Sequence, residues 1–321
     1  MIRLGIVGCA EIAYRRFMPA ALQVEGLEVK AIAEEYDRSK LQNFCNEYGL
    51  EAAESFDELI ARDDIDALYI PQPPALHYKW AKRALEAGKH VLIEKPSTTS
   101  FNDTADLVDT ARAKGLALHE NYMFAYHSQI SDIQKMIRDG EIGDVRLISA
   151  NFGFPMRAQN DFRYNKALGG GALLDAGGYT LKLATVLLGD TIKVDSAHLL
   201  SMKGFEVDMY GNASVSNDDG LVCHLGFGMD CGYRCSLEVW GSKGRLFTNR
   251  IFTAPETLEP VVLIETGDGS KEIKLNKDMH FKHSIEGFVN EISSEEARNK
   301  MYDGILLQSK LVEDVRILAE K

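Results

Sequence analysis

The sequence predicts a two-domain α/β protein, with an N-terminal doubly wound Rossmann domain and a C-terminal α+β domain built on an open, mainly antiparallel sheet. The chain has 321 residues, more than one compact core usually accommodates. Up to about residue 120, short apolar runs alternate with segments of helical periodicity, and beyond it most of the pattern is strand-like. We therefore expect one domain over residues 1–120 and a second over residues 121–321.

The first domain is expected to hold a parallel sheet. Apolar runs of strand length lie at residues 2–7, 27–33, 67–70, 90–93 and 116–119. Segments of helical spacing separate them, and Ser55 with Glu58 forms a capping-box start signal. Gly88 and Gly115 follow two of these segments as helix stop signals. Strands joined by helical crossovers predict a parallel, doubly wound arrangement.

The second domain follows a different rhythm. Helical stretches are expected at residues 129–139, 172–188, 281–292 and 301–319. Strand-like runs lie at residues 145–154, 194–202, 207–215, 221–228, 233–239, 246–249 and 261–265. Turn sequences at residues 217–220 and 241–244 link neighbouring runs, which predicts an antiparallel sheet.

The composition is that of an ordinary folded protein, with 45% hydrophobic and 26% charged residues. Lys and Arg number 36 and Asp and Glu 48, for a formal net charge of −12. This acidity disfavours a nucleic-acid partner, because phosphate binding needs a basic surface. No apolar run reaches the length of a membrane span, and the chain starts with a strand pattern instead of a signal peptide. We expect a cytoplasmic protein with no membrane partner.

The five cysteines form no recognisable metal or disulfide framework. Cys231 and Cys235 lie close in the sequence, but no second pair with metal-ligand spacing accompanies them. We expect reduced thiols and no metal site.

The first strand runs into a turn of small residues that suits a dinucleotide. Gly8 holds the first position of a Rossmann fingerprint, and Ala10 and Ala13 occupy the second and third. The cofactor pyrophosphate would lie against backbone N–H groups at the start of the following helix. An ordinary strand-to-helix turn is the alternative. The candidate cofactor-binding residues of this turn are Gly8, Cys9, Ala10, Glu11 and Ile12.

Acidic residues end the second strand. Glu34, with Glu35 beside it, stands about 20 or more residues beyond the glycine, where a carboxylate can accept hydrogen bonds from the adenosine ribose. Such a carboxylate repels a 2′-phosphate, whereas Arg38 could still reach one. The sequence therefore predicts NAD or NADP as the cofactor, with NAD favoured. A solvated acidic turn is the alternative.

A lysine follows the run at residues 90–93. Ligands of a doubly wound sheet bind beyond the carboxyl ends of its strands, which is where Glu94, Lys95 and Pro96 fall. Hydride transfer to a carbonyl needs a positioned nicotinamide, a proton donor and a positive group that assists. Lys95 is the candidate for the positive group, and Glu94 and Lys95 are also candidate cofactor contacts.

Three segments together resemble one family. They are GCA at residues 8–10, ALEAGKHVLIEKP at residues 84–96 and GGGALLD at residues 169–175. These segments are similar to the Gfo/Idh/MocA oxidoreductases, and the resemblance covers essentially the whole chain. It implies a Rossmann domain, a C-terminal domain whose open sheet often forms a subunit interface, and Lys95 as the catalytic lysine.

The family's second catalytic motif is an Asp followed four residues later by a His. Here the pair is Asp175 and Tyr179, so tyrosine replaces histidine. Residues four apart on a helix share one face. Tyrosine at this position resembles the glucose–fructose oxidoreductase and dihydrodiol dehydrogenase branches, and most of all the sugar-nucleotide ketoreductases of deoxysugar biosynthesis.

The lysine and the tyrosine suggest a division of roles. A free phenol has a pKa near 10, and an ammonium within a few ångströms favours phenolate and lowers that pKa. We expect Tyr179 to donate a proton to the ketone oxygen, Lys95 to polarise that oxygen and Asp175 to orient a substrate hydroxyl. The alternative for Tyr179 is a helix tyrosine packed at a domain interface.

Other candidates follow the fourth apolar run. Pro71 and Pro73 suggest a rigid wall near the cofactor, and the family places dinucleotide contacts here. His77 is a further candidate cofactor residue, although a histidine at this position is more often a helix-start or core residue.

The final candidates border the second domain. Asn121 and Tyr122 follow the run at residues 116–119, so we expect Asn121 near the cofactor and Tyr122 near the substrate. Arg163 lies in the loop before the glycines and could bind a substrate phosphate or hydroxyl, although a surface arginine is about as common there.

The leading hypothesis is a reductase of a keto sugar, with a sugar nucleotide as the best guess for the substrate. The alternatives are oxidation of a free aldose or a dihydrodiol, and a cofactor-binding regulator without turnover. Lys95 and Tyr179 argue against the regulator, because a sensor has no use for a proton donor. By family analogy alone we expect a homodimer or homotetramer through the C-terminal sheet.

Overall fold

The computed structural model describes residues 1–320, and the chain divides into two compact units. Unit 1 comprises Met1–Asn121 and Phe281–Ser309, and unit 2 comprises Tyr122–His280 with the described residues from Lys310 onward. The sequence prediction placed residues 281–309 in the second domain. In the structure they belong to unit 1, because Tyr302 and Ile305 are part of its core.

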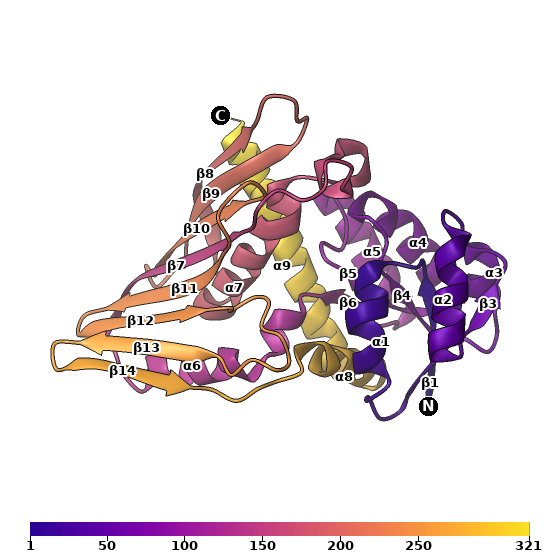
Figure 1. Cartoon of the computed structure of the whole chain (residues 1–321), viewed down its shortest axis with the longest axis horizontal. Helices are drawn as coiled ribbons and strands as arrows, with labels where there is room; N and C mark the ends of the chain where they lie inside the picture. Colours follow the sequence, from indigo (N-terminus) through magenta and orange to yellow (C-terminus); the bar gives the residue numbers. More distant parts are fainter. Residues whose placement is uncertain (321) are drawn as a thin grey trace. The chain divides into compact units, whose positions relative to one another are not determined.

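Unit 1 contains a six-stranded parallel sheet of order β3-β2-β1-β4-β5-β6 (Figure 1). This is the strand order of doubly wound dinucleotide-binding folds, so the predicted Rossmann arrangement is confirmed. Strand β4 is buried on both faces, which is why it reads as a continuous apolar run. The strands are β1 (Ile2–Val7), β2 (Leu27–Ala33), β3 (Glu51–Ala53), β4 (Ala67–Ile70), β5 (His90–Glu94) and β6 (Leu118–Asn121).

Helices cover both faces of this sheet. They are η1 (Ala13–Phe17), α1 (Met18–Ala21), α2 (Arg38–Tyr48), α3 (Phe56–Ala61), α4 (Pro74–Glu86), α5 (Phe101–Lys114), α8 (His280–Ser293) and the part of α9 (Glu295–Ala319) that precedes Lys310. On one face Phe56, Trp80 and Leu107 belong to a single core cluster contributed by α3, α4, α5 and α9. On the other face the ring of Phe17 stacks on Tyr69 of β4, with ring centroids 3.8 Å apart.

The predicted capping signals are confirmed. Ser55 Oγ accepts a hydrogen bond from Glu58 N at 3.1 Å and starts α3. The Glu58 carboxylate reaches back to the backbone N–H of Glu54 at 2.7 Å. Gly115 ends α5 with φ of 66° and Gly88 follows α4 with φ of 79°, the left-handed conformation that glycine adopts readily.

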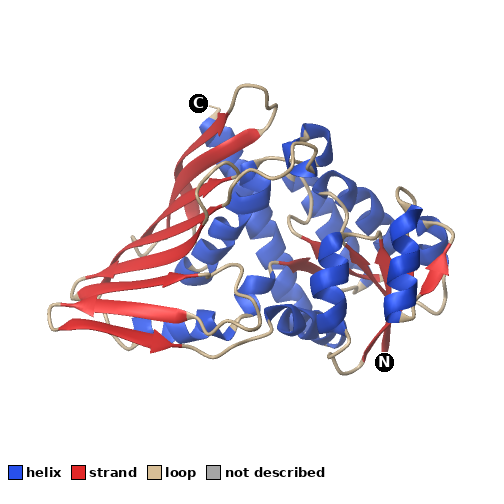
Figure 2. Cartoon of the chain, viewed as in Figure 1, coloured by secondary structure: helices blue, strands red, loops and turns tan. Residues whose placement is uncertain are grey.

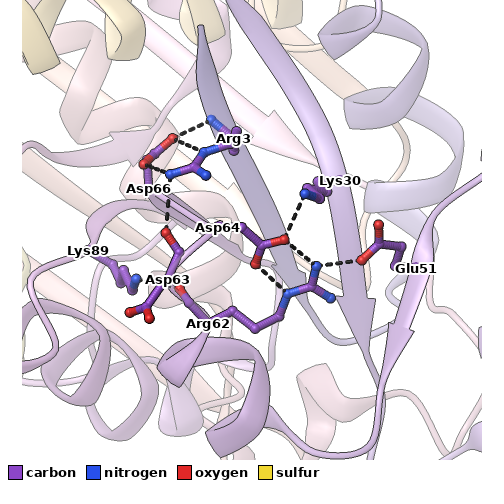
Figure 3. Close-up of polar contacts among 8 residues, drawn as sticks. All are labelled: Arg3, Lys30, Glu51, Arg62, Asp63, Asp64, Asp66 and Lys89. Atoms are coloured by element: carbon purple, nitrogen blue, oxygen red, sulfur yellow. Dashed lines mark hydrogen bonds and ion pairs between the residues drawn. The ribbon is translucent and has the colours of Figure 1, made fainter.

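An ion network lies at the amino ends of the strands (Figure 3). The side chain of Arg3 on β1 binds Asp66 through two contacts, Nη2 to Oδ1 at 2.7 Å and Nε to Oδ2 at 2.9 Å, and the backbone N–H of Arg3 also donates to Oδ2 at 2.9 Å. Asp64 is paired with Arg62 at 2.8 Å and with Lys30 at 2.7 Å. These ion pairs connect residues near the amino ends of the strands. Ligands of a parallel sheet bind beyond the other ends, the carboxyl ends of the strands.

Unit 2 is built on an eight-stranded sheet of order β14-β13-β12-β11-β7-β10-β9-β8. Neighbouring strands are antiparallel except for β7 and β10, so the mainly antiparallel prediction is confirmed. The edge strand β14 escaped prediction because its sequence, GSKEIK, contains a single apolar residue. The strands are β7 (Val145–Gly153), β8 (Lys193–Ser201), β9 (Asp208–Ser216), β10 (Val222–Gly228), β11 (Arg234–Gly241), β12 (Gly244–Asn249), β13 (Val261–Thr266) and β14 (Gly269–Lys274).

The helices of unit 2 gather against one face of this sheet (Figure 2). They are η2 (Met123–Tyr126), α6 (Ser128–Arg138), η3 (Phe162–Tyr164), η4 (Lys166–Leu168), η5 (Leu173–Gly177) and α7 (Gly178–Leu188). Helix α7 packs on β7 and β10, and α6 lies beside it through a hydrogen bond from Gln134 Nε2 to Val186 O at 3.0 Å. Among the described residues no helix has the length and apolarity to cross a membrane.

The opposite face of the sheet carries exposed apolar side chains. Leu200 and Tyr210 face each other across β8 and β9 and are 43% and 42% exposed. Trp240 on β11 and Val261 on β13 each alternate with buried residues, so they point to the same face, where they are 59% and 37% exposed. Leu200 and Tyr210 are adjacent, whereas Trp240 and Val261 stand on other strands of the same face, so this face exposes apolar side chains at several separate positions.

Candidate active site

A glycine lets the turn after β1 approach a glutamine from the loop after β4. Gly8 has φ of +106°, and a Cβ there would lie 1.8 Å from Gln72 Nε2. The buried Gln72 side chain donates a hydrogen bond to Val7 O at 2.9 Å. The two loops are thereby joined. Gln72 stands in the predicted candidate segment between Pro71 and Pro73, but its contact with Val7 was not predicted.

The first helical turn follows directly. Tyr14 N donates to Ala10 O at 3.1 Å, so the helix starts near Ala10, and the first N–H groups of a helix have no partner within it. Ile12 is half-buried, whereas Glu11 is exposed and forms an ion pair with Arg15. Burial raises the pKa of the Cys9 thiol to about 12, which leaves the thiol protonated and unreactive at neutral pH.

Glu34 is buried at the end of β2, and backbone donors hold its carboxylate. Cys9 N donates to Glu34 Oε2 at 2.6 Å. Tyr36 N and Asp37 N donate to Oε1 at 2.8 and 3.2 Å. The negative charge is therefore fixed beside the glycine turn.

The charged neighbours of Glu34 contact the loop before α3. Glu35 Oε1 accepts a hydrogen bond from Phe56 N at 2.8 Å. Arg38 donates to the carbonyl oxygen of Glu54 at 2.5 Å and pairs with its carboxylate at 3.4 Å. Arg38, the predicted candidate for a 2′-phosphate, is thus engaged by a carboxylate of its own unit.

His77 ties the loop after β4 to the loop after β5. Its Nε2 lies 2.6 Å from Gln72 O and its Nδ1 lies 2.8 Å from Pro96 O. The ring is fully buried, and burial lowers the pKa of His77 to about 4. A neutral imidazole carries one N–H, so it donates to one of these two carbonyl oxygens at a time. Both ring nitrogens face protein backbone.

Glu94 and Lys95 stand at the carboxyl end of β5. Glu94 is buried, and its Oε1 accepts hydrogen bonds from Tyr69 Oη and Asn121 Nδ2, each at 2.7 Å. Burial raises the pKa of Glu94, and these hydrogen bonds and the charge of Lys95 act in the opposite direction. Lys95 follows as a half-buried residue. A carboxylate and an ammonium therefore occupy consecutive positions at the edge where ligands bind.

Tyr179 lies in an aromatic cluster of unit 2. Its ring centroid is 5.1 to 5.9 Å from those of Tyr122, Phe124, Phe152 and Phe252. The residue is 6% exposed, and its hydroxyl lies 3.7 Å from Met123 Sδ. The phenol is therefore held by apolar neighbours, and Tyr122 packs directly on it.

Asp175 is held by an arginine. Arg163 Nε donates to Asp175 Oδ2 at 2.6 Å, and Arg163 Nη1 contacts Asp161 at 3.2 Å. A Cβ on Gly170 would lie 2.3 Å from Arg163 O, so this glycine lets the arginine loop approach. Arg163, predicted as a substrate contact, forms ion pairs with Asp175 and with Asp161, which the sequence did not reveal.

The helix that carries Asp175 is anchored at its start. Asp208 Oδ2 accepts a hydrogen bond from Leu173 N at 2.6 Å. Gly171 has φ of +123°, and a Cβ there would lie 2.4 Å from Asp208 Oδ1. Two glycines of the run GGGALLD are thus explained, because Gly170 lies close to the loop that carries Arg163 and Gly171 lies close to Asp208.

The predicted residues fall into two groups. At the carboxyl edge of the unit 1 sheet lie Gly8, Cys9, Ala10, Glu11, Ile12, Glu34, Arg38, Pro71, Pro73, His77, Glu94, Lys95 and Asn121. Tyr122, Arg163, Asp175 and Tyr179 lie in unit 2.

The strand order, the glycine turn and the buried acid after β2 define a dinucleotide-binding α/β protein with a second domain on an antiparallel sheet. Residues 2–122 match a family model described as an oxidoreductase family with an NAD-binding Rossmann fold. Residues 130–247 match the GFO/IDH/MocA C-terminal domain. The chain belongs to the Gfo/Idh/MocA family and is an NAD(P)-dependent oxidoreductase.

Individual relatives are similar over nearly the whole chain. A dTDP-3,4-didehydro-2,6-dideoxy-alpha-D-glucose 3-reductase from Actinomadura kijaniata is 42% identical over 98% of this chain and 95% of the relative. The structure of KijD10, a 3-ketoreductase from the same organism in complex with NADP and TDP-benzene, has a TM-score of 0.95 at 40% identity and covers 99% of this chain and 97% of that one. A D-xylose 1-dehydrogenase (NADP(+)) from Haloferax volcanii is 28% identical over 91% of this chain and 89% of the relative.

Proposed function

We propose that this protein reduces the keto group of a nucleotide-linked deoxysugar with hydride from a nicotinamide cofactor. The observation that carries the proposal is 42% identity, over 98% of the chain, to a reductase of such a substrate. The TM-score of 0.95 to a 3-ketoreductase supports it. The similarity to a free-aldose dehydrogenase is lower, at 28% identity.

In this proposal Lys95, Tyr179 and Asp175 act on the substrate. The nicotinamide supplies the hydride that reaches the carbonyl carbon. Tyr179 gives its phenolic proton to the carbonyl oxygen and regains one from solvent, so that C=O becomes CH–OH. The Lys95 ammonium stabilises negative charge on that oxygen. Asp175, oriented by Arg163, accepts a hydrogen bond from a sugar hydroxyl.

We propose NAD as the preferred cofactor. The fixed carboxylate of Glu34 lies beside the turn expected to hold the pyrophosphate, where it repels a 2′-phosphate. Arg38, which could attract that phosphate, is engaged by Glu54. The 3-ketoreductase KijD10 was solved with NADP, so this preference would distinguish the two proteins.

We also propose a homodimer or homotetramer through the exposed face of the unit 2 sheet. Trp240, Tyr210 and Leu200 would be buried there, and aromatic residues are enriched at protein interfaces. A cytoplasmic location is part of the proposal, because five free thiols suit a reducing compartment.

The proposal is tested with the purified chain and a panel of NADH and NADPH against nucleotide-linked and free keto sugars, followed at the nicotinamide absorbance band. We expect turnover with a dTDP-linked 3-keto deoxysugar. Faster oxidation of D-xylose or a dihydrodiol would replace this function with a dehydrogenase. Tight cofactor binding without turnover on any sugar would indicate a regulator.

Replacing Tyr179 with Phe should lower kcat by ~10²-fold or more, because it removes the proton donor while keeping the ring. Cofactor affinity should be unchanged within about twofold, since the substitution deletes one oxygen. Tyr48→Phe, which removes the phenol that donates to Tyr14 O, is the matched control. A Tyr179→Phe protein with wild-type kcat would remove this residue from the mechanism.

A further inference from the structure

A continuous chain of buried polar side chains connects α8 to Glu94 within unit 1. His119 of β6 lies between two residues of α8, with Nδ1 2.9 Å from Glu291 Oε1 and Nε2 3.0 Å from Ser284 Oγ. Ser284 Oγ donates to Asn121 Oδ1 at 2.8 Å, and Asn121 Nδ2 donates to Glu94 Oε1 at 2.7 Å. Each of the five residues is at most 5% exposed.

It is unusual for a protein core to contain a connected row of hydrogen-bonded polar side chains such as this one. Ser284 and Glu291 are seven residues apart, so they lie on the same face of α8, the face that covers β6. Apolar residues at such positions usually serve stability at least as well, because buried polar groups lose hydration. A fully buried polar chain that ends beside Lys95 therefore suggests a role in the site.

The hydrogen atoms in the chain can be assigned in order. The Ser284 hydroxyl has one hydrogen, which goes to Asn121, so its oxygen accepts a hydrogen bond from His119 Nε2–H. If Nδ1 of His119 carried no proton and Glu291 were a carboxylate, two hydrogen-bond acceptors would lie 2.9 Å apart. A proton therefore lies between His119 and Glu291, in addition to the one on Nε2. Together His119 and Glu291 are electrically neutral, and from His119 onward every donor points toward Glu94.

We propose that Glu291, His119, Ser284 and Asn121 are positioning residues that keep Glu94 as a carboxylate beside Lys95. If the Asn121 amide were rotated, its oxygen would face Glu94 and every hydrogen bond would run in the opposite direction. Glu94 Oε1 would then have to carry a hydrogen, although this oxygen already accepts a hydrogen bond from Tyr69 at 2.7 Å. The functional meaning rests on the proposed reductase. There an ionised Glu94 balances the Lys95 ammonium that acts on the carbonyl oxygen.

Other charged or titratable groups face this chain at both ends. Tyr69 on β4 and Lys95 lie next to Glu94. Arg298 on α9 donates to Glu291 O at 3.0 Å, and the phenol of Tyr302 lies near both Arg298 and Glu291. Burial already raises the pKa of Glu94, so losing the oriented Asn121 donor would raise it further.

The test reads the charge of Glu94 directly by infrared spectroscopy across pH. The carbonyl stretch of a protonated carboxylic acid is resolved from the amide band, and the signal of Glu94 is the one that Glu94→Gln removes. Ser284→Ala removes the hydrogen bond that orients the Asn121 amide, so that Asn121 can turn its donor away from Glu94. Loss of that one donor to the charged form should move the titration midpoint upward by about one pH unit. Ser284→Thr restores the hydroxyl and should restore the midpoint.

Ser309→Ala is the matched control, because this hydroxyl of unit 1 donates to Thr104 and lies outside the chain. It should leave the midpoint unchanged. Should Ser284→Ala fail to fold, Ser284→Cys keeps the volume with a weaker donor and should shift the midpoint in the same direction.

An identical midpoint in wild type and in the folded Ser284 variant would overturn the proposal. A shifted midpoint that the pH profile of kcat/KM follows would support both the chain and the reductase mechanism. A shifted midpoint with an unaffected pH profile of kcat/KM would support the proposal that the hydrogen-bonded side chains keep Glu94 ionised. It would refute the proposal that the Lys95 ammonium acts on the carbonyl oxygen. The two ideas therefore fail separately.

Discussion

The carboxylate of Glu34 is a buried charge whose consequence for cofactor choice can be measured. Glu34→Gln retains the volume and one acceptor oxygen for Cys9 N but removes the charge. Weaker repulsion of a 2′-phosphate should raise the ratio of kcat/KM for NADPH over that for NADH by about tenfold, equivalent to ~1.4 kcal/mol. Steady-state kinetics with both cofactors measure this ratio.

Glu28→Gln is the control for this prediction. Glu28 is an exposed residue of the same strand near its amino end, so the same change of charge should leave the ratio as it is. If Glu34→Gln also leaves the ratio unaltered, the carboxylate does not select the cofactor.

Single residues also show the limit of reading a sequence. Glu34 and Lys95 were predicted because each lies within two residues of the end of an apolar strand run, and that signal is local. The contact of Gln72 with Val7 and that of Asp161 with Arg163 were not predicted, because neither contact leaves a periodic pattern in the sequence. His119 reads as a strand residue, and only its contact with Glu291, 172 positions away, shows it as part of a polar chain.

The strands of unit 1 have charged residues that stabilise the fold at their amino ends and residues of the candidate site at their carboxyl ends. Hydrogen bonds from Arg3 lower the pKa of Asp66 to about 2, so the folded protein holds this proton more weakly than the unfolded chain. The stabilisation is therefore present above the ordinary aspartate pKa of about 3.9 and is lost as the pH falls toward 2. The ion pair contributes little to the free energy of unfolding, because the Asp66 side chain is 34% exposed to solvent.

Asp66→Asn should lower the free energy of unfolding by roughly 0.5–1 kcal/mol at pH 6, and the difference from wild type should shrink toward pH 2. Urea denaturation at several pH values measures this. Affinity for NADH should not change, because the ion network lies at the opposite edge of the sheet from the cofactor turn. Asp63→Asn is the control, since Asp63 contacts Arg3 through its backbone carbonyl (Figure 3). A pH-independent loss of stability in Asp66→Asn would contradict this account.

Elements were predicted well where burial produces periodicity. Strands β1, β2 and β4 were predicted at their observed bounds, because most of their residues are apolar, as is usual for strands of a covered parallel sheet. Strands β3 and β14 were missed because they lie at sheet edges, where few of their residues are buried. Helix α9 begins at Glu295, before the predicted residue 301, because its first turn is polar.

At the scale of the whole molecule, the exposed face of the unit 2 sheet predicts self-association. Trp240→Asp replaces the most exposed of the apolar side chains on this face with a charge, and desolvating that charge in an interface is unfavourable. Light scattering after gel filtration should show the wild type as a multiple of one chain and Trp240→Asp at the mass of one chain. Leu22→Asp, at a 63% exposed leucine of unit 1, should retain the wild-type mass. A monomeric wild-type protein would refute this assembly.

The sequence by itself determined the Rossmann order of the first domain, the mainly antiparallel second sheet, the oxidoreductase class and the candidate lysine, tyrosine and acidic residues. These features depend on local periodicity and on short motifs, which a single chain displays in order. Tertiary structure alone decided that residues 281–309 belong with the first unit, that Arg163 pairs with Asp175, and that His119, Ser284 and Glu291 form a chain to Glu94. Each of these requires side chains distant in sequence to meet in space, and hydrophobic periodicity records burial but not the identity of the partner.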